Sequence, residues 1–194
     1  SLYFQKDATA NTWSVYDSLT STTAIGTIAF DGTGKLKTIT QIGPIPTPAV
    51  AMLTKSLRAD LGVMISASHN PFQDNGIKFF AGGGFKLEDA LEDEIESLLG
   101  KTWSRPTGAG VGQITTSVET ADEAYISHLV SSIDVSLEGL KIVVDCANGA
   151  TSAVAPEALR RCGAEVIVIN AEPDGYNINA NCGSTHPEQL QETV

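Results

Sequence analysis

A short polar segment gathers several side chains that can do chemistry. The string Ser-Ala-Ser-His-Asn-Pro occupies residues 66–71, and Lys78 follows it closely. Ser68 offers a hydroxyl that can carry a group, His69 an imidazole that can move a proton, and Asn70 an amide that can fix a loop. A lysine in water is protonated at pH 7, so Lys78 is suited to donate a proton or to contact an anion. Taken alone, the same residues could form a polar turn beside a solvated strand lysine.

Two apolar runs flank this segment and must position it. Residues 61–65 are short and rich in bulky apolar side chains, which is typical of a buried strand. Residues 77–80 predict a second strand, and Asn-Pro at 70–71 and Asn-Gly at 75–76 mark turns between the two. Because open α/β sheets bind ligands beyond the carboxyl ends of parallel strands, we expect Ser68 just past such an end.

The complete string is more specific than its parts. Residues 66–71, followed by Asp-Asn-Gly-Ile-Lys-Phe-Phe at 74–80, resemble the active-serine loop of the α-D-phosphohexomutases. The Ser-Ala-Ser and Ile-Lys-Phe-Phe versions are most similar to the members that act on glucosamine phosphates. The resemblance begins near Gln41 and continues to residue 194. It implies an α/β protein with three-layer α/β/α domains.

The resemblance also implies a reaction and its site residues. Phosphorylated Ser68 would move phosphate between the 6- and 1-oxygens of a phosphorylated hexosamine, with His69 and Lys78 as acid/base or phosphate-contacting groups and Asn70 fixing the loop. The family uses Mg²⁺, held by the phosphate on Ser68 and by an Asp-Gly-Asp-Gly-Asp loop, and no such loop occurs in this sequence. The chain is therefore expected to hold only part of the active site.

Two alternatives to this enzyme stay open. One is a chain without enzymatic activity, either a truncated or a fused fragment. The other is a phosphomannomutase or phosphoglucomutase relative, because the loop that sets sugar specificity in the family is absent from the sequence.

Composition argues against several other classes. The chain has 194 residues, 42% of them hydrophobic, and a net charge of −11. This charge argues against binding to nucleic acid or to an anionic membrane surface, and no apolar span is long enough for a transmembrane helix. The three cysteines, Cys146, Cys162 and Cys182, have no metal-ligand spacing and suit free thiols in a reducing cytoplasm.

The sequence divides into three parts. Residues 1–40 are rich in Ser, Thr and Gly, predict a β-rich antiparallel appendage and resemble a segment of a flagellar hook protein. The Gly-Thr-x-Gly-Ile-Arg-Gly loop that normally opens the mutase family is not visible, so residues 41–135 are expected to form an incomplete first domain. Residues 136–194 are expected to be the truncated start of a second domain. The incomplete sheet predicts marginal stability or self-association through an unpaired edge.

Periodicity predicts the other elements. Thr47 is expected to cap a helix over 48–59, and Leu91, Ile95 and Leu98 are expected to face inward from a helix over 88–99. Thr120 opens a predicted capping box. Further expectations are a loop or weak strand over 101–118, a helix over 120–133, strands over 140–146 and 165–169, and a helix over 155–162. Asp145 and Asn148, which follow the first of those strands, are interpreted as turn-forming residues.

Overall fold

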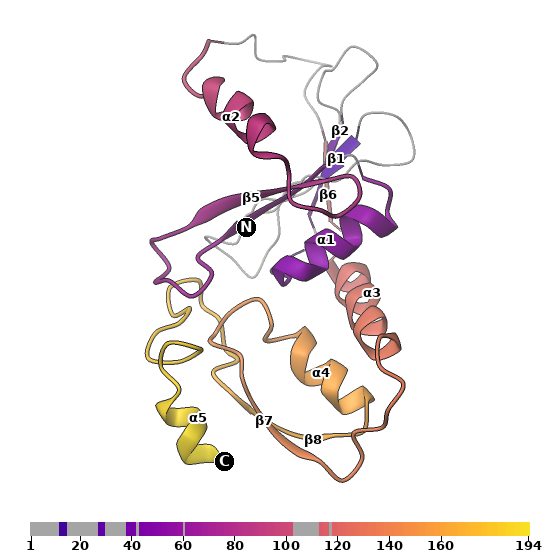
Figure 1. The fold of residues 1–194 in the computed structure, drawn as a ribbon, viewed down its shortest axis with the longest axis vertical. Coiled ribbons are helices and arrows are strands. Elements are labelled where there is room, and N and C mark those ends of the chain that lie inside the picture. Colours follow the sequence, from indigo (N-terminus) through magenta and orange to yellow (C-terminus); the bar gives the residue numbers. More distant parts are fainter. Residues whose placement is uncertain are drawn as a thin grey trace.

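The computed structural model of the chain describes residues 12–14, 27–29, 38–41, 43–59, 61–102, 113–116 and 118–194, called the described residues below. In the view of Figure 1 they form an upper group, which contains β1 to β6, α1 and α2, and a lower group, which contains β7, β8, α4 and α5. Helix α3 (Val118–Ser131) lies at one side between the two groups. None of the described helices is both long and apolar enough to cross a membrane.

The predicted strand–loop–strand unit is present in the upper group. β4 (Leu61–Ser66) and β5 (Gly76–Ala81) pair with each other, with Met64 opposite Lys78. The pair is antiparallel, so the expectation that Ser68 follows a parallel strand is wrong for the pairing that the described residues show. The physical reason is the connection, because residues 67–75 are fewer than the dozen or so that a parallel crossover needs. Residues 67–75 are called the serine loop below.

The amino-terminal strands confirm one expectation and add a pairing that was not predicted. β1 (Thr12–Ser14) and β2 (Thr27–Ala29) are antiparallel, as expected for a β-rich segment. Except for residues 38–40, the rest of the predicted β-rich segment over 1–40 lies outside the described residues. β3 (Thr38–Gln41) pairs in parallel with β6 (Gln113–Thr116), so of the two alternatives predicted for 101–118, a loop or a weak strand, the described residues show a strand at 113–116. Parallel pairing was not predicted because four-residue strands rich in Thr carry little periodic signal.

Three details of the helices correct the sequence-based expectations. Helix α1 (Thr47–Ser56) already includes Thr47, and Pro46 occupies the cap position without a side-chain hydrogen bond. Helix α3 begins at Val118, and the carboxylate of Glu123 accepts hydrogen bonds from Arg161 and Ser127 rather than completing a capping box. No residue of α2 (Asp89–Ser97) is buried, and of the stripe predicted to face inward Leu91 and Leu98 are exposed and Ile95 is partly buried, so the predicted burial is wrong.

The lower group contains the predicted βαβ unit. β7 (Lys141–Asp145) and β8 (Glu165–Ile169) are parallel, with Lys141 opposite Glu165 and Asp145 opposite Ile169. Helix α4 (Val154–Arg161) connects them and buries Val154, Pro156 and Ala158. The chain then runs through a long loop to α5 (Glu188–Thr193).

One hydrophobic core joins the two groups. Val154 and Ala158 of α4 pack in the same cluster as residues from α1, β4 and α3. The buried members of this cluster are Ile45, Ala49, Val50, Leu53, Met64, Ala121, Tyr125, Ile126, Val154 and Ala158. At the edge of the core Arg161 of α4 binds both carboxylate oxygens of Glu123 of α3, at 2.7 and 2.9 Å. These hydrogen bonds lower the pKa of Glu123, so the pair favours the charged form of both groups.

Candidate active site

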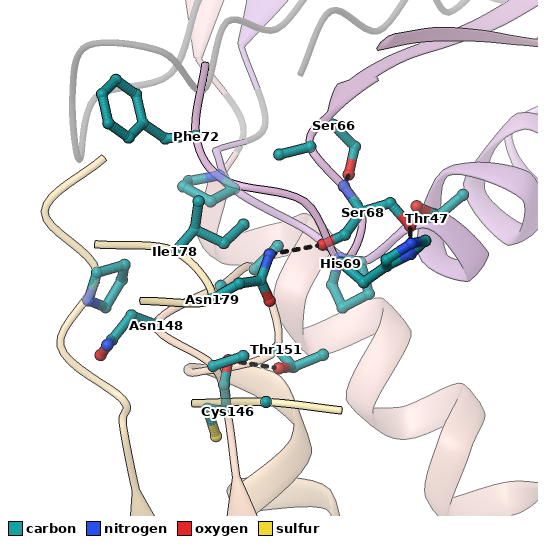
Figure 2. Close-up of a pocket in the computed structure, with 18 of the residues that line it drawn as sticks. Thr47, Ser66, Ser68, His69, Phe72, Cys146, Asn148, Thr151, Ile178 and Asn179 are labelled. Atoms are coloured by element: carbon teal, nitrogen blue, oxygen red, sulfur yellow. Dashed lines mark hydrogen bonds between the residues drawn. The ribbon is translucent and has the colours of Figure 1, made fainter. Parts of the chain in front are cut away.

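A cleft of about 560 Å³ lies between the serine loop and the lower group. One wall comes from the start of α1, the end of β4 and the serine loop, and the other from the loops that follow β7 and β8 (Figure 2). Ser68 and His69 line the cleft together with Thr47. The carboxyl end of β7 also opens into it, where a parallel strand pair places its ligand-binding loops.

Ser68 is held in a conformation that exposes its hydroxyl. Its backbone has φ 56°, in the left-handed region, and its side chain is exposed. The N–H of Ser68 donates to Oγ of Ser66 at 3.0 Å, and the N–H of Asn70 closes the turn by donating to the carbonyl of Ala67 at 2.9 Å. These two bonds hold the turn that follows Ser66, the last residue of β4 that pairs with β5. They leave the hydroxyl of Ser68 at the tip of the turn.

His69 is the titratable group beside that hydroxyl. Its Nδ1 lies 3.4 Å from Oγ of Ser68, a long hydrogen bond whose direction depends on the imidazole tautomer. In Figure 2 the imidazole lies on the same side of the loop as Thr47. The arrangement suits proton exchange between the serine oxygen and the imidazole.

Asn70 and Lys78 do not line the cleft. Asn70 is exposed and contributes its main-chain groups to the loop, and among the described residues its side chain makes no hydrogen bond. The amide side chain that locks the loop internally is that of Asn75, which donates to the carbonyl of Phe72 at 2.6 Å. Lys78 is exposed on β5 opposite Met64. The structure thus brings Ser68 and His69 together.

The opposite wall is held by the residues that the sequence predicted as turn-formers. Asp145 accepts hydrogen bonds from the N–H of Ala147 at 2.9 Å, from Nδ2 of Asn170 at 3.1 Å and from the N–H of Gly183 at 2.7 Å. Oδ1 of Asn148 accepts the N–H of Glu172 at 3.1 Å. The interpretation of Asp145 and Asn148 is confirmed, because their polar atoms are engaged in fixing the two loops.

The cysteines of this wall are poor nucleophiles. All three cysteines of the chain are free thiols, and Cys146 and Cys182 are buried. Burial raises the pKa of both thiols, and the nearby carboxylate of Asp145 raises it further. Since the thiolate is the reactive form, Ser68 is the better candidate for a covalent intermediate.

Asn179 was not predicted from sequence. It follows β8 in the loop of residues 171–184, and its Nδ2 donates to the carbonyl of Ser68 at 2.9 Å (Figure 2). The same nitrogen donates to the carbonyl of Asn70 at 2.8 Å. Nearby, the rings of Phe72 and Tyr176 meet edge to face with centroids 5.3 Å apart. The asparagine-rich run at 177–181 is the one sequence signal for this contact, and it does not identify a partner more than 100 residues away.

Comparison with known proteins gives two family matches. The model "Phosphoglucomutase/phosphomannomutase, alpha/beta/alpha domain I" matches residues 17–105, and the corresponding domain II model matches residues 123–194. The first match begins inside the segment 1–40.

Among curated proteins the chain is similar to several phosphoglucosamine mutases. It is 65% identical over 157 residues to the one from Bifidobacterium animalis subsp. lactis, which covers 78% of this chain and 35% of that protein. It is 59% identical to the one from Rhodococcus jostii and 57% identical to the one from Thermobifida fusca, each over 80% of this chain. The chain spans about a third of the length of these relatives.

Solved structures give the same fold at lower identity. A phosphomannomutase candidate from Thermus thermophilus superposes with a TM-score of 0.64 and 27% identity, covering 81% of this chain and 36% of that one. A phosphoglucomutase/phosphomannomutase family protein from Burkholderia thailandensis superposes with a TM-score of 0.60 at 23% identity, over 80% of this chain and 34% of that one, and supports the fold alone.

Proposed function

Because the chain belongs to the phosphoglucomutase/phosphomannomutase family, the α-D-phosphohexomutases, we propose that it carries the phosphoserine of a phosphoglucosamine mutase. The observation that carries this proposal is the exposed, left-handed Ser68 at the rim of the cleft, with His69 beside its hydroxyl. Identities of 57% to 65% with phosphoglucosamine mutases favour a hexosamine phosphate over the substrate of a phosphomannomutase, for which the structural neighbour is 27% identical.

The proposed reaction has two phosphoryl transfers. In the first, the bond between phosphorus and Oγ of Ser68 breaks while a hydroxyl oxygen of glucosamine 6-phosphate bonds to phosphorus and loses its proton. The resulting bisphosphate then reorients in the site, so that its other phosphate faces Ser68. In the second, its other phosphate returns to Oγ of Ser68, and the sugar oxygen that it leaves takes up a proton, which yields glucosamine 1-phosphate.

His69 is the group that we assign to the proton at the serine oxygen. From 3.4 Å it can give a proton to Oγ as the phosphate departs and take it back as the phosphate returns. Lys78 is proposed as an acid/base or phosphate-contacting group. Asn70 is proposed to support the loop through its main chain, in place of the expected side-chain hydrogen bonds, because its N–H donates to the carbonyl of Ala67 and its carbonyl accepts from Asn179. These roles are supported by the matching positions in the active-serine string.

The described part of the cleft supplies little positive charge. Its lining includes Asp145 and Asp174 and, among the described residues, no lysine or arginine. A phosphoserine adds about −1.5 to −2 charges at pH 7, which must be neutralised for transfer. The described residues also contain no group of three or more His, Cys, Asp or Glu that could hold a metal ion. They do not by themselves fit the Mg²⁺ site of the family.

We place the protein in the cytoplasm. The support is the chemistry of its thiols, because three free cysteines persist in a reducing compartment.

Phosphopeptide mapping tests the proposal. The 194-residue chain is incubated with glucosamine 1,6-bisphosphate, and phosphate is expected on Ser68, slowly and without sustained mutase turnover. Ser68→Ala should abolish the label. Ser184→Ala is the matched control, since Ser184 is an exposed serine that lines the same cleft, and it should leave the label unchanged. Phosphate on Ser66 or Ser184 in place of Ser68, no phosphate at all, or turnover that survives Ser68→Ala would contradict the proposal.

A further inference from the structure

We infer that Asn179 is a positioning residue for the phosphorylated serine, acting from the second domain on the backbone of the serine loop. The inference rests on the proposed function of Ser68 and adds a second element to its site. Among the described residues Asn179 makes no hydrogen bond to the hydroxyl of Ser68 or to the side chain of His69. It binds the two carbonyl groups that bracket His69, those of Ser68 and Asn70.

The two hydrogen bonds use both protons of one amide nitrogen. Nδ2 of Asn179 lies 2.9 Å from the carbonyl oxygen of Ser68 and 2.8 Å from that of Asn70. Since both partners are carbonyl oxygens, they can only accept, and the amide orientation follows without ambiguity. A single side chain therefore fixes the carbonyl directions at both ends of His69.

Asn179 is itself rigidly supported. Its backbone has φ 58°, and its N–H donates to the carbonyl of Ala147 at 2.9 Å. A Cβ added at Gly183 would lie 2.8 Å from Cβ of Ala147 and 3.3 Å from Oδ1 of Asn179, so only glycine fits there. Gly183 is anchored in turn by its N–H bond to Asp145. The hydrogen bonds to Ala147 and to Asp145, the last residue of β7, therefore hold the segment from which the amide of Asn179 reaches the serine loop.

This contact favours the geometry that phosphoryl transfer needs. A carbonyl oxygen carries partial negative charge and would repel a phosphate dianion beside it. In Figure 2 the carbonyl of Ser68 points toward Asn179, whereas its hydroxyl lies on the other side, toward His69 and Thr47. Binding by Asn179 keeps the carbonyl on the side away from the phosphate. It also stabilises the left-handed backbone of Ser68, a conformation that is unfavourable for a residue with a side chain.

The test compares the same change, asparagine to aspartate, at two positions of the same loop. Asn179→Asp keeps the size and the tolerance for a left-handed backbone but replaces the donor by a carboxylate that faces two carbonyl oxygens. Asn181→Asp is the matched control, because Asn181 also has a left-handed backbone, φ 54°, and among the described residues makes no hydrogen bond to the serine loop. Asn179→Gly is a second variant that removes the donor without adding charge.

Two readouts are measured on the full 194-residue chain. Amide hydrogen exchange of the peptide that contains residues 67–72 should speed up about tenfold in Asn179→Asp and Asn179→Gly and stay unchanged in Asn181→Asp. At saturating glucosamine 1,6-bisphosphate the rate of Ser68 labelling should fall at least about tenfold in both Asn179 variants, with the half-saturating concentration within about twofold. This pattern separates positioning from loss of ligand binding or of the fold.

Each result has a defined meaning. Unchanged exchange in the serine loop of both Asn179 variants would overturn the inference, and so would an equal increase in Asn181→Asp. An unchanged labelling rate despite faster exchange would overturn the positioning role in the reaction. If the unmodified chain takes no label, the proposed function fails, and hydrogen exchange still decides whether Asn179 holds the loop.

Discussion

The strongest stability prediction concerns the carboxylate of Asp122 on α3. Burial raises its pKa from 3.8 to about 6, and its Oδ1 is buried without a hydrogen-bond partner among the described residues. The neighbouring residue Ala121 and, one turn on, Tyr125 and Ile126 belong to the hydrophobic core. Asp122 is the fifth residue of α3, beyond the first turn in which the helix dipole favours a negative charge. Its charged form is therefore destabilised without compensation.

The direction of the pH effect follows from the raised pKa. The folded state binds the proton more tightly than the unfolded chain, so the contribution of the neutral carboxyl to stability is present below about pH 4 and is lost as the pH rises through about 6. A shift of about two pKa units corresponds to about 3 kcal/mol, which is an upper limit because Asp122 is only half-buried. Asp122→Asn should therefore raise the free energy of unfolding by about 1 to 3 kcal/mol at pH 8 and change it little at pH 4.

Urea unfolding followed by far-UV circular dichroism measures this difference. Wild type and Asp122→Asn are compared at pH 4 and pH 8. Asp134→Asn, an exposed carboxylate just after α3, serves as the control and should change stability little at either pH. A variant effect of the same size at both pH values, or a loss of stability at pH 8, would refute the burial argument.

Two further predictions concern packing and association. A Cβ at Gly62 would overlap Oγ1 of Thr54, which is buried against β4, so Gly62→Ala should lower the free energy of unfolding by about 1 to 3 kcal/mol. In the same urea titrations the strand control Gly76→Ala, whose Cβ would meet only the carbonyl of Ser66 at 4.0 Å, should cost less than about 0.5 kcal/mol, and equal losses would show the reasoning to be wrong. The exposed apolar side chains of Leu91 in α2 and of Leu98 and Leu99 just after it predict self-association. Sedimentation velocity should show larger species as concentration rises, and a monomer with a sharp, concentration-independent melt would count against it.

Local chemistry explains which elements could be predicted from sequence. Both ends of the strand over 165–169 were predicted correctly, because a continuous β-branched run is followed by polar residues. The helix of the βαβ unit was displaced by one residue. For α2 the sequence correctly predicted which apolar side chains share a face, but the prediction that this face is buried was wrong. Spacing shows which side chains lie on one face and not whether another element covers that face.

The candidate site also has features that the sequence predicts and features that only the structure shows. Ser68 and His69 could be predicted because the chemistry and the turn are encoded within one short string. The left-handed backbones of Ser68 and Ala147 could not, because neither residue type prefers that conformation and tertiary contacts impose it. Asn179 could not be predicted either, since its partners lie far away in sequence and its role exists only after β7, β8 and β4 have been placed.

The position of Ser68 therefore depends on both expected domains. Domains of one chain usually move relative to each other unless their interface is large and hydrophobic. Here α4 contributes Val154 and Ala158 to the core of α1 and α3, and the Arg161–Glu123 pair closes its edge. The amide of Asn179 acts from the far side of this packed connection, so we expect it to restrain the serine loop. A first domain separated from residues 136–194 would keep the string of the active serine and lose the contacts that orient it.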